Sequence, residues 1–290
     1  MTYRLDVHVP SYTHGKKEAL KNIRFQLESG TIYGLWGRNG AGKTTLMRCI
    51  TGLLKVNKGY VQLNEASPFE NREVLEKICF IQENHPLFYL WKVKDALKVA
   101  SYFYPNWSWE KAKKCLVTFE LQDSLKVNQM SKGMKTALAL TIGLSSGAPV
   151  LIFDEPTNGL DASLREKFYD LLMDEHSLGD KIIILSTHYI QELQRYIEEL
   201  IVLHDGELIL QESLERIRER TGYIHGKKET LPSYINNENI LDRKQIGPML
   251  RLMIEDESLV DKFDENVDLQ DYLLRKTDGE VGEETLHEGA

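Results

Sequence analysis

A glycine-rich turn near the N-terminus constrains the fold of this chain more than any other feature. Residues 37–44 satisfy the pattern G-x-x-x-x-G-K-[ST], in the order Gly37, Arg38, Asn39, Gly40, Ala41, Gly42, Lys43 and Thr44. An apolar run, 32–36, comes before the turn, and apolar residues with helical spacing come after it. A strand, a glycine-rich turn and a helix in this order predict an α/β fold of the P-loop type.

The residue types of this turn indicate what it binds. Glycines let successive backbone N–H groups converge on phosphate oxygens, and the next helix adds its positive N-terminal end. Lys43 suits the β- and γ-phosphates of a nucleoside triphosphate, and the Thr44 hydroxyl suits Mg²⁺. With Thr45, which follows directly, residues 37–45 form the predicted binding site for ATP and Mg²⁺.

Two carboxylates follow a second apolar run. Residues 150–153 read VLIF and lead into Asp154 and Glu155. Ligands of open α/β sheets bind at the carboxyl ends of strands, so we expect both side chains beside the phosphates. Asp154 suits the Mg²⁺ ion, and Glu155 suits the polarisation of an attacking water. The alternative is that these acidic residues end the strand only by meeting solvent.

The rest of the pattern completes the predicted fold. The runs 150–153 and 182–185 are typical of central parallel strands, with a helical segment, 164–173, between them. Alternating apolar residues predict two strands near the N-terminus, at 3–9 and 23–27. Asp205 and Gly206 indicate a hairpin turn between 200–203 and 208–210. Residues 85–147 read mostly as helix.

Charge divides the chain near residue 210. Residues 1–210 carry 25 basic and 25 acidic side chains, whereas residues 211–290 carry 11 and 19. We therefore expect one domain over 1–210 and an acidic, partly helical C-terminal extension over 211–290. Within the extension, 246–274 predicts one or two amphipathic helices, and the last ~15 residues, 276–290, are expected to be disordered. An acidic extension argues against nucleic acid as a partner.

The sequence predicts a cytoplasmic protein. No run approaches the ~20 apolar residues that a membrane-spanning helix needs, and the N-terminus lacks the layout of a secretory signal. The three cysteines, Cys49, Cys79 and Cys115, are widely spaced and predict neither disulfides nor a zinc site. Any role at a membrane would therefore need a separate partner protein.

From about residue 3 to 210 the chain resembles the ATP-binding-cassette (ABC) family. Residues 131–134 look like the signature segment of that family, and they read Ser131, Lys132, Gly133, Met134. In the family this segment caps the γ-phosphate of ATP bound to the opposite subunit. Lys132 and Met134 replace the consensus glycine and glutamine, a variant similar to that of bacterial antibiotic-resistance and cell-envelope exporters.

Three further residues resemble motif positions of the family, in the expected order. Gln82 resembles the Q-loop glutamine, which reaches Mg²⁺ and the attacking water; Asp161 resembles the D-loop aspartate at the dimer interface; and His188 resembles the switch histidine at the γ-phosphate. Each alone is more often structural than functional. The aromatic residue that stacks on adenine is either Tyr12 or His14, and the sequence does not choose between them.

The resemblance implies a fold and a function. It implies a P-loop core with a mixed sheet, an antiparallel β subdomain and a helical subdomain over about 85–147. It also implies an ATPase that pairs with a second copy or a related cassette and drives an integral-membrane permease, and it favours an exporter. The chain would then lie at the inner face of the cell membrane. The alternatives are a soluble ABC ATPase of the iron–sulfur assembly type and a regulatory ATPase.

Overall fold

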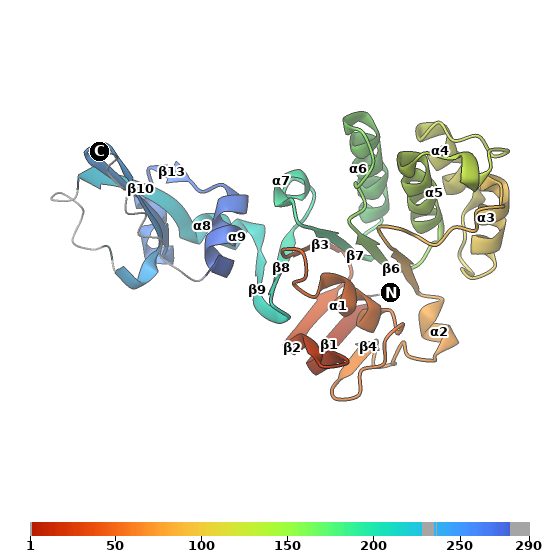
Figure 1. Cartoon of the computed structure of the whole chain (residues 1–290), viewed down its shortest axis with the longest axis horizontal. Helices are drawn as coiled ribbons and strands as arrows, with labels where there is room; N and C mark the ends of the chain where they lie inside the picture. The colour runs from red at the N-terminus through yellow and green to blue at the C-terminus, as the bar shows by residue number, and fades with distance from the viewer. Residues whose placement is uncertain (1, 228–234, 236, 279–290) are drawn as a thin grey trace. The chain divides into compact units, whose positions relative to one another are not determined.

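The computed structural model describes residues 2–227, 235 and 237–278, and these residues form two compact units (Figure 1). The first unit comprises residues up to His188 together with Arg195–Gln211. The second comprises Tyr189–Gln194 and the chain from Glu212 onward. None of the helices in the described residues is long and apolar enough to cross a membrane.

The first unit is built on one nine-stranded sheet, in the order β4-β1-β2-β9-β8-β3-β7-β6-β5. Its strands are β1 (Arg4–His14), β2 (Lys17–Glu28), β3 (Thr31–Trp36), β4 (Tyr60–Leu63), β5 (Ile78–Ile81), β6 (Val150–Asp154), β7 (Ile182–Thr187), β8 (Glu199–His204) and β9 (Glu207–Ser213). Strands β5, β6, β7, β3 and β8 run parallel, whereas β1 pairs antiparallel with β2 and β4. The mixed sheet and the antiparallel part confirm the predicted fold class.

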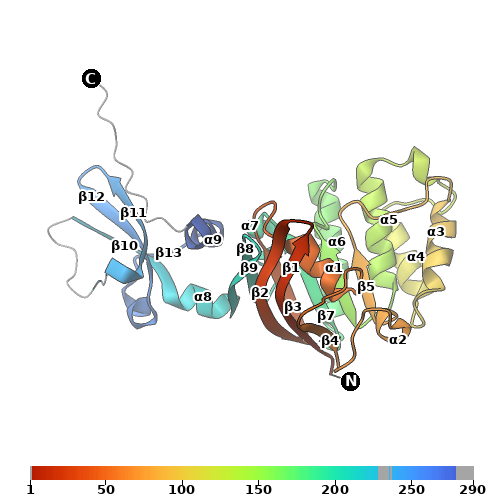
Figure 2. The same ribbon diagram turned by 60° about the horizontal axis from the view of Figure 1, so that its bottom comes forward.

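Helices cover this sheet and extend beyond it. They are α1 (Lys43–Ile50), α2 (Arg72–Leu75), α3 (Val93–Ser101), α4 (Trp109–Thr118), α5 (Lys132–Ser145) and α6 (Ala162–His176), with a 3₁₀ turn at Val127–Gln129. The buried face of α1 shares one apolar core with β1, β2, β6 and β7. Figures 1 and 2 show α3, α4 and α5 grouped together, away from β1, β2 and β4.

The local predictions for this unit agree with the structure. Strands β6 and β7 are fully buried along their length, as their continuous apolar runs predicted, and α6 connects them. Asp205 and Gly206 both have positive φ, 45° and 81°, and they form the turn between neighbouring strands β8 and β9. Such φ values suit a tight turn whose twist matches that of its strands.

The second unit is a four-stranded antiparallel sheet with short helices. Its elements are α7 (Ile190–Leu193), α8 (Leu214–Arg220), β10 (Thr221–Lys227), β11 (Ile240–Ile246), β12 (Met249–Glu255), β13 (Glu265–Asn266) and α9 (Leu269–Asp278), with 3₁₀ turns at Asn237–Asn239 and Glu257–Lys262. The strand order is β11-β12-β10-β13. Buried Ile224, Leu252 and Ile254 lie at the centre of a separate apolar cluster.

Part of the prediction for the C-terminal extension was wrong. Residues 249–255 form a strand rather than the start of an amphipathic helix, because β12 pairs with β11 on one side and β10 on the other. Consecutive apolar residues then serve a central strand, and Leu252, Met253 and Ile254 are all buried. Residues 276–278, expected to be disordered, form the end of α9. The rest of that call, 279–290, lies outside the described residues.

Candidate active site

The glycine-rich turn connects β3 to α1, as its pattern predicted. Gly40 and Gly42 have φ of 88° and 103°, a conformation that side chains with a Cβ rarely adopt. Gly37 is required for a different reason, since a Cβ there would lie 2.6 Å from the carbonyl oxygen of Leu203. The turn therefore folds tightly against β8 and presents its backbone N–H groups at the start of α1.

Lys43 is the first residue of α1 and is buried, at 7% exposure. Its ammonium donates to the Gly37 carbonyl oxygen at 2.5 Å and lies 3.7 Å from the Glu155 carboxylate. Burial lowers the pKa of Lys43, and the nearby carboxylates Glu155 and Asp154 oppose that change. A cavity of about 530 Å³ opens here. A buried cation beside a glycine turn fits the phosphate groups of a nucleotide.

Asp154 ends β6 and holds two hydroxyl groups. The Thr44 hydroxyl donates to one carboxylate oxygen at 2.9 Å, and the Ser186 hydroxyl donates to the other at 2.6 Å. Ser186 is opposite Asp154 in the parallel pairing of β6 with β7. No sequence motif predicted a role for Ser186; its place on the strand before His188 was the available signal.

Glu155 follows β6 in a left-handed conformation, with φ of 50°. Its backbone N–H donates to the Ser186 hydroxyl at 3.0 Å, which holds this strained residue in place. Its side chain lies 2.9 Å from Nδ1 of His188. Burial raises the pKa of Glu155, and the hydrogen bond with His188 and the charge of Lys43 limit the increase. A buried carboxylate with a raised pKa is a suitable proton acceptor.

The structure brings together most residues predicted for the ATP site. His14, residues 38–45, Asp154 and Glu155 all line the cavity beside Lys43. Tyr12 does not line it; its ring packs edge-to-face with the His14 ring, with the ring centroids 5.2 Å apart. Gln82 also lies outside this cavity. Its side-chain oxygen accepts from Arg48 at 3.5 Å, and it borders a second cavity that Glu155 also lines.

The signature and D-loop residues do not line the lysine cavity of their own chain. Ser131 is the N-cap of α5 and accepts from the Met134 N–H at 3.2 Å. Asp161 is the N-cap of α6 and accepts from the Leu164 N–H at 2.9 Å. Both side chains thus have local structural roles in the single chain. Glu83, which the sequence analysis left out, does line the cavity.

Comparisons with known proteins agree on one family. The family model described as "ABC transporter" matches residues 20–158. The chain is 26% identical over 233 residues to the ABC transporter ATP-binding protein YtrB of Bacillus subtilis, covering 80% of this chain and 78% of that protein. It is also 34% identical over 202 residues to rat ATP-binding cassette sub-family A member 17. That match covers 66% of this chain but only 11% of the rat protein's length.

Solved structures give the same result. A dimeric structure of MJ0796, a bacterial ABC transporter cassette, superimposes with a TM-score of 0.65 at 26% identity, covering 73% of this chain and 98% of that one. A second structure of MJ0796, bound to ADP and Pi after hydrolysis, matches equally well. Glycine turn, buried lysine and paired carboxylates thus occur here in the fold of known ATP-hydrolysing cassettes. The chain belongs to the ABC transporter family, as an ATP-binding subunit with ATPase activity.

Proposed function

We propose that this chain is the motor subunit of a membrane transporter and works as a pair of identical subunits around two ATP molecules. One subunit supplies the glycine turn, Lys43 and the two carboxylates; the other supplies Ser131 and Gly133 at the start of its α5. The placement of Ser131 outside the lysine cavity of its own chain supports this division. A helix N-terminus attracts anions, so α5 suits the γ-phosphate across an interface.

Adenine would stack on His14 rather than on Tyr12. His14 lines the lysine cavity, and its Nε2 lies 3.4 Å from the Thr45 hydroxyl at the start of α1. Tyr12 contacts the edge of the His14 ring and would hold it in place. This arrangement supports one aromatic contact to the base, with the triphosphate extending toward Lys43.

Hydrolysis would use Glu155 as the proton acceptor. A water molecule attacks the γ-phosphorus, the bond to the β-phosphate oxygen breaks, and Glu155 takes the water proton; the products are ADP and phosphate. His188, in contact with Glu155, would also reach the γ-phosphate. The oxygen atoms of Thr44 and Asp154, 2.9 Å apart, suit Mg²⁺, and Gln82 is the third ligand we assign. The bound ion would neutralise phosphate charge.

An exposed apolar groove supports a permease as the partner. A cavity of about 880 Å³ is lined by Leu53, Phe80, Gln82, Tyr102 and Phe103 among others. Leu53, Tyr102 and Phe103 are 59%, 69% and 66% exposed. Large apolar side chains rarely remain this exposed together unless a partner covers them. Gln82 borders both this groove and the cavity that Glu155 lines. Gln82 would therefore couple changes at the ATP site to a permease segment bound in the groove.

The signature segment supports an exporter rather than an importer. Its Ser-Lys-Gly-Met sequence resembles bacterial exporters of the antibiotic-resistance and cell-envelope type, which supports export across the cell membrane. The chain would then lie in the cytoplasm and attach to the inner membrane face through its permease. Within residues 85–91, His85, Pro86, Leu87 and Tyr89 line the smaller cavity beside Glu155.

Measuring molecular mass with and without Mg-ATP tests the paired arrangement. The variant Glu155→Gln should bind ATP, double its mass and lose nearly all turnover, because it keeps the site but loses the proton acceptor. Lys43→Ala should lose ATP binding itself, and Lys114→Ala, at an exposed position far from the turn, should behave as the parent. If Glu155→Gln hydrolyses ATP at the parent rate, another residue activates the water.

Co-purification in detergent with a multi-span membrane protein encoded beside this gene tests the partner. Phe103→Asp should reduce capture of that protein at least tenfold, because burying a carboxylate in an apolar groove is unfavourable. Val117→Asp, which places the same charge on a position that is 78% exposed and does not line the groove, is the control. Equal capture by both variants would place the permease elsewhere.

A further inference from the structure

Glu83 lies where three loops of the ATPase core meet. It follows Gln82 directly, and its side chain lines the cavity that contains Lys43. Its Oε1 accepts a hydrogen bond from the side-chain amide of Asn158 at 3.2 Å. The same oxygen lies 3.6 Å from Nζ of Lys132. One carboxylate therefore contacts the loop before α6 and the start of α5 from the edge of the nucleotide cavity.

Lys132 reaches Glu83 across a close contact between two loops. The aliphatic part of Lys132 lies over Gly159. A Cβ on Gly159 would be 3.1 Å from the Cγ of Lys132. A Cβ on Gly133 would be 2.5 Å from the carbonyl oxygen of Gly159. The Thr136 hydroxyl adds a hydrogen bond to the Asn158 carbonyl oxygen at 3.1 Å. The first turn of α5 therefore rests directly on residues 158–159.

Lys132 is a departure of this chain from the consensus signature segment. The consensus places glycine at position 132, and glycine cannot extend to Glu83. In the structure the Lys132 ammonium lies beside Glu83, and its stem is held along Gly159. The Lys132 side chain is exposed, at 59%, and that of Glu83 is half-buried, at 39%. An ion pair that an arriving subunit would cover gains strength as water leaves it.

We propose that Glu83 is a positioning residue that connects the nucleotide cavity of one subunit to the α5 terminus serving the ATP of its partner. Lys132 is the side chain that completes the connection. The idea rests on the paired arrangement proposed above. When ATP fills the lysine cavity, the position of Glu83 sets the position of Ser131 through Lys132 and residues 158–159. Each ATP therefore helps to form the other site.

A double-mutant cycle in the full-length Glu155→Gln variant tests this inference. The dissociation constant of the Mg-ATP dimer is measured by sedimentation for the parent, Glu83→Gln, Lys132→Gln and the double variant. Each single change should weaken the dimer about three- to tenfold, since each dimer contains two partly exposed ion pairs. The double variant should be no weaker than either single one, because both lose the same contact.

Two controls separate positioning from general damage. Lys114 and Asp174 form an exposed ion pair at 2.6 Å elsewhere on the same unit, and their glutamine and asparagine variants should leave the dimer unchanged. Melting temperatures without nucleotide should stay within about one degree of the parent for Glu83→Gln and Lys132→Gln. A large fall in melting temperature that accounts for the weaker dimer would overturn a positioning role.

Other outcomes contradict the proposal in identifiable ways. If Lys132 acts directly on the partner's triphosphate, Glu83→Gln frees it and strengthens the dimer, while Lys132→Gln weakens it. Additive losses in the double variant would mean that the two residues act independently. If the Glu155→Gln parent binds ATP but stays monomeric, the proposed paired function fails first, and the connection fails with it.

Discussion

At the scale of single residues, the site is held in place by contacts that cross between strands. Ser186 on β7 accepts from the backbone N–H of Glu155 and donates to the carboxylate of Asp154, so one hydroxyl fixes the Asp154 side chain and the Glu155 backbone at the end of β6. Glu155 keeps a left-handed backbone that is costly for a residue with a Cβ. The strain aims its carboxylate at Lys43 and His188 rather than along the strand.

His85 leads to a prediction about pH. Burial lowers its pKa to about 4, and its Nδ1 has no hydrogen-bond partner among the described residues. In the unfolded chain the His85 imidazole binds a proton near pH 6.5, whereas in the folded chain it binds one only near pH 4. The contribution of neutral His85 to the free energy of unfolding is fully present above pH 6.5 and is lost as the pH falls toward 4. At pH 5 this loss amounts to about 2 kcal/mol.

Urea unfolding at pH 7.5 and pH 5 measures this effect. The free energy of unfolding of the parent should fall about 2 kcal/mol more between these two values than that of His85→Gln. The comparison of differences removes any packing loss that the substitution causes at both pH values. An equal fall in the two proteins would show that His85 protonates normally in the folded state.

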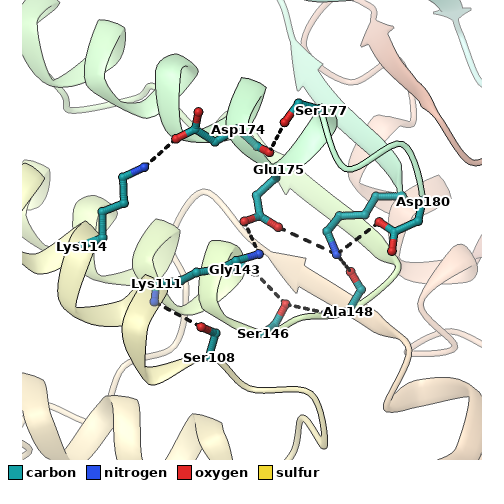
Figure 3. A network of polar contacts seen from close by, with 11 residues as sticks. Ser108, Lys111, Lys114, Gly143, Ser146, Ala148, Asp174, Glu175, Ser177 and Asp180 are labelled. Atoms are coloured by element: carbon teal, nitrogen blue, oxygen red, sulfur yellow. Dashed lines mark hydrogen bonds and ion pairs between the residues drawn. The ribbon is translucent and has the colours of Figure 1, made fainter.

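At the scale of elements, a buried charge network connects the helical subdomain to the sheet. Figure 3 shows Glu175 of α6 beside Lys111. Lys111 of α4 lies 2.5 Å from one carboxylate oxygen, and Lys181, just before β7, lies 3.8 Å from the other. Lys181 also donates to the Ala148 carbonyl oxygen, and burial lowers its pKa. The network therefore ties α4 to the part of the core that supports β6 and β7.

Removing the central charge should be costly. Glu175→Gln leaves Lys181, which is 6% exposed, with the exposed Asp180 carboxylate at 3.9 Å in place of its buried partner. We expect the free energy of unfolding to fall by about 3 kcal/mol. The neighbouring pair of Lys114 with Asp174 is exposed, so Asp174→Asn should cost less than about 1 kcal/mol. Chemical denaturation of both variants makes the comparison. Equal losses would mean that burial does not strengthen the network.

At the scale of the whole molecule, the described residues divide into two compact units. The ATP site belongs entirely to the first, whose large cluster joins β1, β2, α1 and the parallel strands. The second has its own cluster around Ile254, with α7 included in the same unit. Within that unit the Ile190 N–H donates to the Gln270 side chain at 3.2 Å. The segment that directly follows His188 thus belongs to the C-terminal unit.

Calorimetry should therefore record two unfolding transitions. ATP at a hundred times its dissociation constant adds about 2.7 kcal/mol to the unit that binds it, which raises one midpoint by roughly 5–10 °C. Ile254→Ala, at a fully buried position of the second unit, should reduce the unfolding free energy of that unit by about 2–5 kcal/mol. It should therefore lower only the other midpoint temperature. A single transition that both changes move would show that the cores unfold as one.

The sequence by itself determined the local chemistry of this protein. The spacing of Gly37, Gly42 and Lys43 specified the phosphate turn. Glycine suits the positive φ of Gly42 and the close approach of Gly37 to β8, because it has no Cβ. Continuous apolar runs fixed β6 and β7 as central strands with carboxylates at the end of β6. These features depend on neighbours in the chain, and local pattern is sufficient to specify them.

Only the tertiary structure decided which distant residues meet. The pairing of β6 with β7 places Ser186 on Asp154, and the contact of α5 with residues 158–159 brings Lys132 to Glu83. The same dependence explains the error at 249–255, where strand partners on both sides override a helix-like apolar spacing. Side-chain contacts between segments far apart in sequence depend on packing, for which a single sequence carries no periodic signal.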